Sequence, residues 1–471
     1  MKRLAISLIL ALLSSFLLNV PVLAAPSAIK LNIINHSGYP DNQVYLVFYG
    51  QAHSDTGPNA GNVRRLDWQT GNFTTISTND NSPNDINGTA FSQYGAIPDT
   101  YANYSTTLSA LPRDANGHRY FNLPTITDSP PGFASGRLYI SFQRPVYLHI
   151  NGPQAYTQPG YTLTATDVNA ILQTKFDFFE PALDPDFKVW ADTTNVDAVG
   201  MPLLYELKNG NTSLGTKGLA QPMSQLRGAF LRDPVLKGLV TPAMIIAPGH
   251  GIQNSLFPSN YLDNYIAYAW PVWTSTNPLT INYDTVKWSG YVINTQLVLT
   301  GNVNTSSGSV SETHYIHYPS TSDVFFCQNT LGGDTSLKGI NYDPNTKLDA
   351  FNRDADLKNN VGAALNRAVF HLNPYPTGHG SDNFPWFAYR DGYNGMIFYG
   401  QNGVPAGQFA TNIYSKLLHQ LCYDGVNIYG FAYDDNCNIS TTISGYGDTI
   451  NLTIGNYLPS STGALDLLLL D

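Results

Sequence analysis

Apolar and polar residues alternate at every second position in the first part of the chain. The alternation is clearest in four runs, namely IKLNIINHS, NQVYLVFYGQ, GRLYISFQ and PVYLHING, with turns rich in Gly, Pro and Asn between them. Period-two alternation predicts half-buried β-strands, and many short strands in succession are typical of a β-sandwich or barrel. We therefore expect a β-domain over residues 26–204.

The pattern changes after Pro202. Apolar residues take helical spacing in three segments, MSQLRGAFLRDPVLKGL, NYLDNYIAYAWPVW and NNVGAALNRAVFHL, and strand-like pieces such as YVINTQLVLTGNV lie between them. This mixture predicts an α/β domain over residues 205–424. Residues 425–471 return to strand patterning, so we expect them to complete the β-domain around an inserted α/β domain.

The first 25 residues predict an export signal. Lys2 and Arg3 precede a long apolar run that ends in AAP, and these are the three parts of a cleavable signal peptide. An uncleaved membrane anchor is the alternative interpretation. No later stretch is apolar enough to span a bilayer. We expect a protein secreted to the extracellular space or the periplasm, with no membrane attachment after signal removal.

The composition points to a neutral ligand. Only 12% of the residues are charged, the formal net charge is -10, and the pI is about 5.4. Nucleic-acid partners require basic patches, so this balance argues against them. A chain rich in Tyr, Asn, Asp and Trp suits a hydroxyl-rich ligand such as a glycan.

Three cysteines exclude a framework of many disulfides. The odd count of Cys327, Cys422 and Cys437 leaves room for one bond and one buried thiol. The pair that we expect to be bonded is Cys422 with Cys437.

Glutamate is scarce, and one of the few glutamates ends an aromatic run. The chain contains 31 Asp but only three Glu, and Glu180 closes the segment FDFFE. If this segment is a strand, Phe176, Phe178 and Glu180 share one face. Aromatic neighbours dehydrate a carboxyl group and raise its pKa, which is what a general acid requires near neutral pH.

Asp197 is the candidate partner of Glu180. It lies 17 residues further on, in NVDAVGMPL, where a hairpin-like return would bring it opposite Glu180 in a more polar setting. Two such carboxyl groups are the working pair of most glycoside hydrolases. Trp190, between them, is a candidate platform for sugar stacking. The alternative is structural: Glu180 ends a strand, Asp197 caps a turn and Trp190 packs.

Other polar motifs do not assemble into a site. His314 and His317, near Glu312, would point to opposite faces of a strand, and zinc needs convergent ligands. The segments TGHGSDNFPW and APGHGIQ are Gly-flanked histidine loops, and the G-x-S-x-G motif of serine hydrolases does not occur. We expect no metal and no organic cofactor.

The segment NRDADLKNN carries charges but no calcium signature. It lacks the Gly and the terminal Glu of a calcium loop. We expect a solvated loop that precedes a helix.

An ordered set of segments resembles a known family. NVDAVGMPL and the later YGFAYDD are similar to two strands of the thaumatin-like fold, which border an acidic cleft. The longer chain resembles glycoside hydrolase family 64, the β-1,3-glucanases with a thaumatin-like barrel. The remaining matching segments, in the order of the family over roughly residues 28–458, are GRLYISF, FDFFEP, MIIAPGHG, YLDNYI, GAALNRAVF and NIYSKLLHQ.

The resemblance implies a mainly β protein with α/β: a thaumatin-like sandwich or barrel, an inserted α/β domain, and a wide groove between them for laminarin-like or curdlan-like β-1,3-glucan. It implies an endo-β-1,3-glucanase that hydrolyses with inversion, with Glu180 as general acid and Asp197 as general base, roughly 6.5–9.5 Å apart to admit water. Trp190 would line the groove near the cleavage point. Asp434 and Asp435 match the paired aspartates of the closing strand, where a substrate-binding role at the cleft rim and a structural role are both open. We expect a monomer.

The chain departs from the family pattern beside Glu180. Thr and Asn usually follow the glutamate at the second and fourth positions, whereas Ala182 and Asp184 stand here, so Asp184 is a candidate substrate contact. The charges of Asp184 and Asp186 would either raise the pKa of Glu180 further or mark a cleft that has lost activity. The alternatives to a glucanase are therefore a non-catalytic thaumatin-like protein that binds β-glucan, and a glycosidase for another polysaccharide. Product length and endo or exo preference stay open.

Overall fold

The computed structural model describes residues 28–124, 129–161, 166–283, 285–372, 400, 401, 403–434 and 441–458. The expected signal peptide, the TGHGSDNFPW segment, Asp435 and Cys437 lie outside these residues. Within the described part of the chain, no helix is both long enough and apolar enough to cross a membrane.

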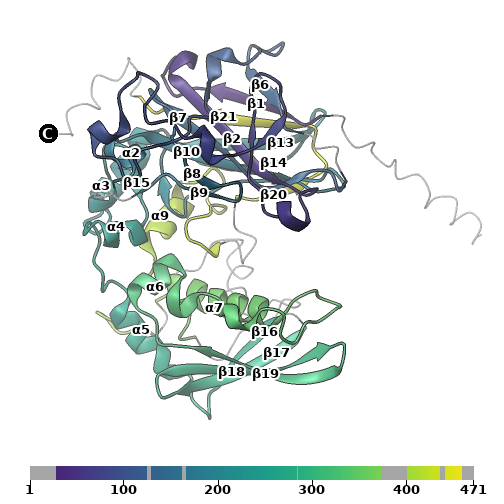
Figure 1. Cartoon of the computed structure of the whole chain (residues 1–471). Helices are drawn as coiled ribbons and strands as arrows, with labels where there is room; N and C mark the ends of the chain where they lie inside the picture. The colour runs from purple at the N-terminus through teal and green to yellow at the C-terminus, as the bar shows by residue number, and fades with distance from the viewer. Residues whose placement is uncertain are drawn as a thin grey trace, which may run out of the picture.

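Two β-sheets pack face to face in the upper part of Figure 1. The five-stranded sheet has the order β14 (Thr212–Gly218), β13 (Leu203–Asn209), β21 (Thr449–Ile454), β1 (Lys30–Asn35) and β6 (Arg119–Asn122). The eight-stranded sheet has the order β20 (Ile443–Gly445), β11 (Val189–Thr193), β10 (Lys175–Leu183), β7 (Phe133–Phe142), β2 (Val44–Ala52), β3 (Arg64–Leu66) and β4 (Phe73–Thr75), with β5 (Thr106–Thr107) paired to β2.

Alternating apolar side chains fill the space between these sheets, as the period-two pattern predicts. The core contains Leu46 and Phe48 from β2, Leu138 and Ile140 from β7, and Phe179 from β10. The two ends of the chain meet in this core, because β1 runs parallel to β21 along its whole length. β20 and β21, late in the chain, each belong to one of the two sheets.

The sandwich extends beyond residue 204, where we expected the first domain to end. β13 and β14 pair with each other, and β13 pairs with β21. Leu203, Tyr205 and Leu207 alternate into the sandwich core, so the apolar pattern that defines the sheet continues past the expected boundary.

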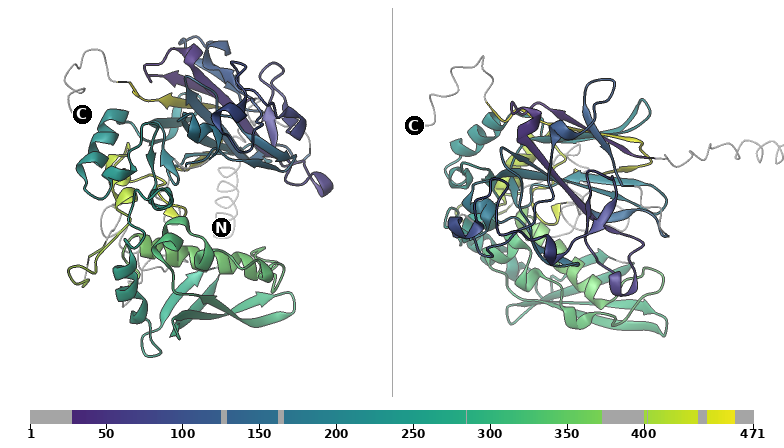
Figure 2. Two further views of the ribbon diagram at one scale, coloured as in Figure 1. Left: turned by 60° about the vertical axis from the view of Figure 1, so that its left-hand side comes forward. Right: turned by 45° about the horizontal axis from the view of Figure 1, so that its top comes forward.

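The segment between β14 and β20 contains most of the helices. They are α3 (Met223–Arg232), α4 (Pro248–Gln253), α5 (Asp263–Ala269), α6 (Thr321–Phe326), α7 (Ala350–Asn366) and α9 (Ile413–Leu421). An antiparallel sheet of β16 (Leu279–Tyr283), β17 (Val286–Ile293), β18 (Gln296–Thr305) and β19 (Gly308–Ile316) lies below α7 in Figures 1 and 2. One continuous apolar cluster links this sheet and α7, through α3 to α5, to the outer face of the eight-stranded sheet.

Short elements complete the connections. β8 (His149–Gly152) pairs with β9 (Ala155–Thr157), α2 (Val168–Ile171) precedes β10, and β12 (Ala198–Val199) pairs with β15 (Ile245–Ile246).

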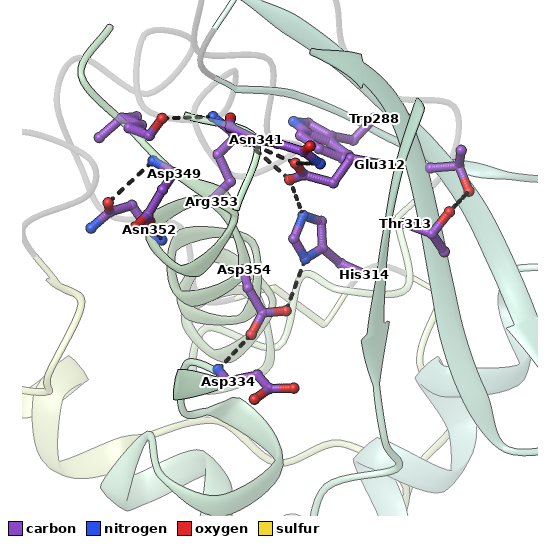
Figure 3. Close-up of polar contacts among 12 residues, drawn as sticks. Trp288, Glu312, Thr313, His314, Asp334, Asn341, Asp349, Asn352, Arg353 and Asp354 are labelled. Carbon is purple, nitrogen blue, oxygen red and sulfur yellow. Dashed lines mark hydrogen bonds and ion pairs between the residues drawn. The ribbon is translucent and has the colours of Figure 1, made fainter. Parts of the chain in front are cut away.

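The charged segment NRDADLKNN is not the solvated loop that we expected, because it forms the first half of α7. A reciprocal cap between Asp349 and Asn352 begins the helix. Asp354 and Lys358, one turn apart, form a buried ion pair at 2.8 Å. The charge of Asp354 is also tolerated inside because β19 supplies a second partner (Figure 3): His314 Nδ1 lies 3.0 Å from Asp354 Oδ1.

The same buried cluster explains the histidines of ETHYIHY. Glu312 accepts hydrogen bonds from Arg353 at 3.0 Å and contacts His314 at 2.7 Å, whereas His317 is exposed beside Gln296. The two histidines thus diverge, as their spacing predicts. Among the residues that the structure describes, no group of three or more His, Cys, Asp or Glu side chains is arranged to hold a metal ion.

Cys422 is a buried free thiol, as is Cys327, so the expected bond from Cys422 to Cys437 is not formed. The Cys422 Sγ donates to the His419 carbonyl at 3.2 Å and to Asp424 at 3.4 Å. Burial raises the pKa of this thiol to about 12, which keeps it protonated and unreactive.

Candidate active site

A row of polar side chains crosses the outer face of the eight-stranded sheet. Tyr49 on β2 pairs with Arg137 on β7, and Glu180 on β10 pairs with Asp192 on β11. The neighbouring pair of Tyr139 and Phe178 fixes the register between β7 and β10, which places Arg137 beside Glu180. Directly paired residues share a face, so these four side chains project together.

Opposing effects act on the pKa of Glu180. Its side chain is 25% exposed, and Arg137 Nε donates to its Oε1 at 2.8 Å. Burial raises the pKa of Glu180, Arg137 lowers it, and the negative charge of Asp197 raises it again, so that the pKa lies above the usual value on balance. The aromatic strand thus has the effect that its sequence predicts, but with a cation opposing it.

Arg137 is itself set among aromatic rings. Its guanidinium lies 4.7 Å from the centre of the Phe178 ring, which is a favourable cation–π distance. Its Nη1 is buried and has no hydrogen-bond partner among the described residues. Arg137 thus contacts Glu180 through Nε and the Phe178 ring through its guanidinium.

After β11, the segment that contains Asp197 and Gly200 packs against β10, which brings Asp197 to the site. Asp177, on the opposite face of β10 from Glu180, accepts hydrogen bonds from the backbone of Gly200 and Met201 at 2.9 and 3.1 Å. A Cβ on Gly200 would lie 1.7 Å from the Phe176 carbonyl oxygen, so only glycine permits this approach. The return brings Asp197 within electrostatic reach of Glu180, although the residue directly opposite Glu180 is Asp192 and not Asp197.

His250 holds Asp197. Its Nε2 lies 2.9 Å from Asp197 Oδ1, and its Nδ1 lies 3.1 Å from Gln253 Oε1. The Tyr161 ring packs on the imidazole with 4.9 Å between ring centres. The backbone anchors the same contact, because the Asp197 carbonyl accepts from Ala247 N at 2.8 Å.

The segment APGHGIQ, which we read as an isolated histidine loop, is therefore part of the site. It forms α4 directly after β15, and β15 pairs with β12, which follows Asp197 in the chain. A histidine on the first turn after β15 consequently faces Asp197. The apolar run MII before the motif was the available signal for that strand.

Trp190 is exposed and not packed in the core. It lies on β11 on the same face as Glu180, and its side chain is 40% exposed. Asp184 accepts a hydrogen bond from the indole Nε1 at 2.6 Å, and Lys188 Nζ lies 4.2 Å above the ring. Asp184 thus fixes a ring that remains open to solvent.

Asp434 does not lie at a cleft rim. Its side chain is fully buried and contacts Arg367 at 2.6 Å, His419 at 2.8 Å, and Ser415 and Gly430 N at 3.0 Å. Burial opposes its charge, but His419 and Arg367 hold the pKa of Asp434 below the usual value. A carboxylate enclosed by four donors cannot contact substrate, so its role is structural. Asp435 lies outside the described residues.

Comparisons with known proteins identify the family. The family described as β-1,3-glucanase, glycoside hydrolase family 64, matches residues 27–453. The chain belongs to glycoside hydrolase family 64. It is therefore a glycoside hydrolase of the β-1,3-glucanase family.

Solved family 64 structures share the fold. A β-1,3-glucanase domain from Clostridium beijerinckii has a TM-score of 0.64 at 22% identity, over 91% of this chain and 98% of that one. A laminaripentaose-producing β-1,3-glucanase in complex with laminaritetraose has a TM-score of 0.62 at 21% identity, over 92% and 99%. The enzyme from Paenibacillus barengoltzii has a TM-score of 0.56 at 21% identity, over 93% and 78%. No curated protein matches the chain.

Proposed function

We propose that this family 64 chain is a secreted enzyme that hydrolyses β-1,3-glucan with inversion, with Glu180 as general acid and Asp197 as general base. The observation that carries the proposal is the raised pKa of Glu180, caused by burial and by Asp197 nearby. Two carboxyl groups with different neighbours, one beside Arg137 and one beside His250, are the arrangement that inverting glycosidases use.

In the proposed reaction, Glu180 donates its proton to the glycosidic oxygen as the bond from that oxygen to the anomeric carbon breaks. Asp197 removes a proton from a water molecule that attacks the opposite face of the same carbon. The new hydroxyl group has inverted configuration, and both carboxyl groups then exchange protons with solvent. His250 orients Asp197 through the 2.9 Å contact.

We assign the sandwich to the thaumatin-like type, with the α/β region inserted between β14 and β20. The glucan is proposed to run along the outer face of the eight-stranded sheet, between this sheet and the inserted region. Export through residues 1–25 would deliver the enzyme to polymeric glucan outside the cell.

One observation favours the non-catalytic alternative, a thaumatin-like protein that binds β-glucan. The contact from Arg137 to Glu180 stabilises the carboxylate form, which cannot donate a proton. The two functions differ in their products, because a binding protein retains glucan without releasing reducing sugar.

The test is release of reducing ends from laminarin and curdlan. Glu180→Gln and Asp197→Asn should each lower kcat by about 10²- to 10⁴-fold, and NMR of fresh product should show the α-anomer. Glu206→Gln is the matched control, because Glu206 lies on β13 of the other sheet and should leave activity unchanged. Full activity of Glu180→Gln, or release of the β-anomer, would contradict the assignment.

A further inference from the structure

A continuous strip of side chains leads from Glu180 towards the edge of the eight-stranded sheet. Ala182, two residues after Glu180 on β10, pairs with Trp190 on β11, and Trp190 pairs with Ser444 on β20. Side chains of directly paired residues lie on one face. The Trp190 indole therefore stands between two small side chains, and neither neighbour is large enough to cover it.

Tyr446 continues this strip. It follows directly after the end of β20 at Gly445, and it is 48% exposed. Its hydroxyl donates to Asp186 Oδ2 at 2.6 Å. Tyr446 is therefore a second exposed aromatic ring beyond Trp190 as seen from Glu180.

One short turn fixes both rings. Asp184 and Asp186, two residues apart between β10 and β11, accept hydrogen bonds from Trp190 and Tyr446 at 2.6 Å each. The turn is closed by the bond from Asp184 N to the Lys188 carbonyl at 2.9 Å. Single exposed aromatic residues are common on protein surfaces. Two exposed rings tied at their polar edges to one turn, one of them with Lys188 over one face, are preorganised for a ligand, because less side-chain entropy is lost on binding.

The chemistry of the strip selects its ligand. A pyranose presents an apolar face of C–H groups and an edge of hydroxyl groups, which match an aromatic face and a carboxylate edge. Asp184 and Asp186 outnumber Lys188, so the strip repels polyanions such as nucleic acids or uronates. A neutral glycan chain fits both features.

We propose that Tyr446 forms a glucan-binding subsite beyond Trp190, so that one β-1,3-glucan chain contacts Glu180, Trp190 and Tyr446 in succession. This inference rests on the proposed glucanase function and adds the residue that determines how far the bound chain extends. Asp186 is the positioning residue that holds the Tyr446 ring. Asp184 and Asp186 thereby acquire a role in holding the platform.

The experiment compares long and short substrates. Tyr446→Ala should raise KM for laminarin by about 2- to 10-fold, the worth of one aromatic contact, with kcat unchanged. An interaction made equally in the bound and transition states changes KM alone. Laminari-oligosaccharides too short to extend past Trp190 should be hydrolysed as by the wild type. Tyr446→Phe keeps the ring but loses the bond to Asp186, so it should raise KM less than Tyr446→Ala does.

Tyr315→Ala is the matched control. Tyr315 is 52% exposed and lies on β19, where strand alternation turns it away from Glu312 and His314. Its loss should leave both KM and kcat unchanged. A wild-type KM for laminarin in Tyr446→Ala, across the whole substrate series, would overturn the subsite.

Binding to insoluble curdlan separates this inference from the proposed catalysis. In the Glu180→Gln background, adding Tyr446→Ala should weaken retention on curdlan by the same factor. If the wild type binds curdlan without hydrolysis and Tyr446→Ala weakens binding, the subsite stands and the catalytic proposal falls. If the wild type neither binds nor hydrolyses glucan, both fall.

Discussion

Arg137 Nε lies 2.8 Å from Glu180 Oε1, so the proposed general acid rests against a permanent cation. A guanidinium stays charged throughout the working range of pH. The raised pKa of Glu180 is therefore a balance, in which burial and Asp197 outweigh Arg137. Substitution of Arg137 should therefore shift the pH dependence of activity, although Arg137 does not take part in the proton transfer.

Arg137→Met should move the alkaline limb of the kcat/KM profile upward by about one pH unit or more. Removal of the cation disfavours the carboxylate, so Glu180 keeps its proton to higher pH, and that limb reports the acid of the free enzyme. Arg137→Lys retains the charge and should move the limb less. An alkaline limb that stays in place in a folded Arg137→Met variant would argue against the acid role of Glu180.

Gly200→Ala should disrupt the return that carries Asp197. The added Cβ would meet the Phe176 carbonyl oxygen at 1.7 Å, so the backbone must move. We expect a loss of roughly 1–3 kcal/mol in the free energy of unfolding and, for a shift of about 1 Å at Asp197, about a 100-fold fall in kcat. Thermal unfolding and laminarin kinetics measure the two effects.

Gly228→Ala is the control for this substitution. Gly228 lies inside α3, where the nearest atom to an added Cβ is Arg232 Nη1 at 3.5 Å. Alanine in a helix should stabilise by about 0.5–1 kcal/mol, with activity unchanged. Equal behaviour of the two alanine variants would show that the close approach at Gly200 is not required.

His314→Gln should destabilise the buried cluster below α7 by about 3–5 kcal/mol near pH 6, because Glu312 and Asp354 lose a shared cation. Burial opposes the charge of His314, but these two carboxylates raise its pKa above 6.5 on balance. Because the pKa of His314 is higher in the folded than in the unfolded protein, its charge stabilises the fold fully at pH values below the unfolded-state pKa. This contribution is lost as the pH rises through the folded-state pKa. The difference in melting temperature from the wild type should therefore be largest near pH 6 and shrink in alkali.

The exposed His317→Gln serves as the control and should change little at any pH. A constant difference between His314→Gln and the wild type would contradict the charged imidazole. Glu312 gives the opposite pH dependence. Burial raises the pKa of Glu312, but hydrogen bonds from His314 and Arg353 lower it from 4.5 to about 2. That contribution is present above about pH 4.5 and is lost as pH falls towards 2.

Asp434→Asn should lower the free energy of unfolding by about 3–5 kcal/mol, because its buried ion pairs with Arg367 and His419 would be lost. KM for laminarin should stay unchanged at temperatures where the variant is folded. Asp67→Asn, in an exposed turn, is the control and should leave the melting temperature nearly unchanged. A raised KM with normal stability in Asp434→Asn would restore the cleft-rim interpretation.

The charged stretch at residues 352–360 shows where local patterning misleads. Arg353, Asp354 and Lys358 have the composition of a solvated loop, yet all three are buried in α7. Arg353 and Asp354 find partners on β19, about 40 residues earlier in the chain, and Lys358 contacts Asp354 and the Gly332 carbonyl. A pattern read within a short window contains no information about charges that tertiary contacts will supply.

The sequence by itself determined which face of β10 carries Glu180, since side chains alternate strictly along a strand. It also determined the aromatic flank that raises the pKa of Glu180. Only the tertiary structure decided what lies near this carboxyl group: Arg137 from 43 residues earlier, and Asp197, which the return at Gly200 brings close and His250 on α4 contacts. Such neighbours depend on strand register and on close backbone approach, which arise only when segments distant in sequence pack together.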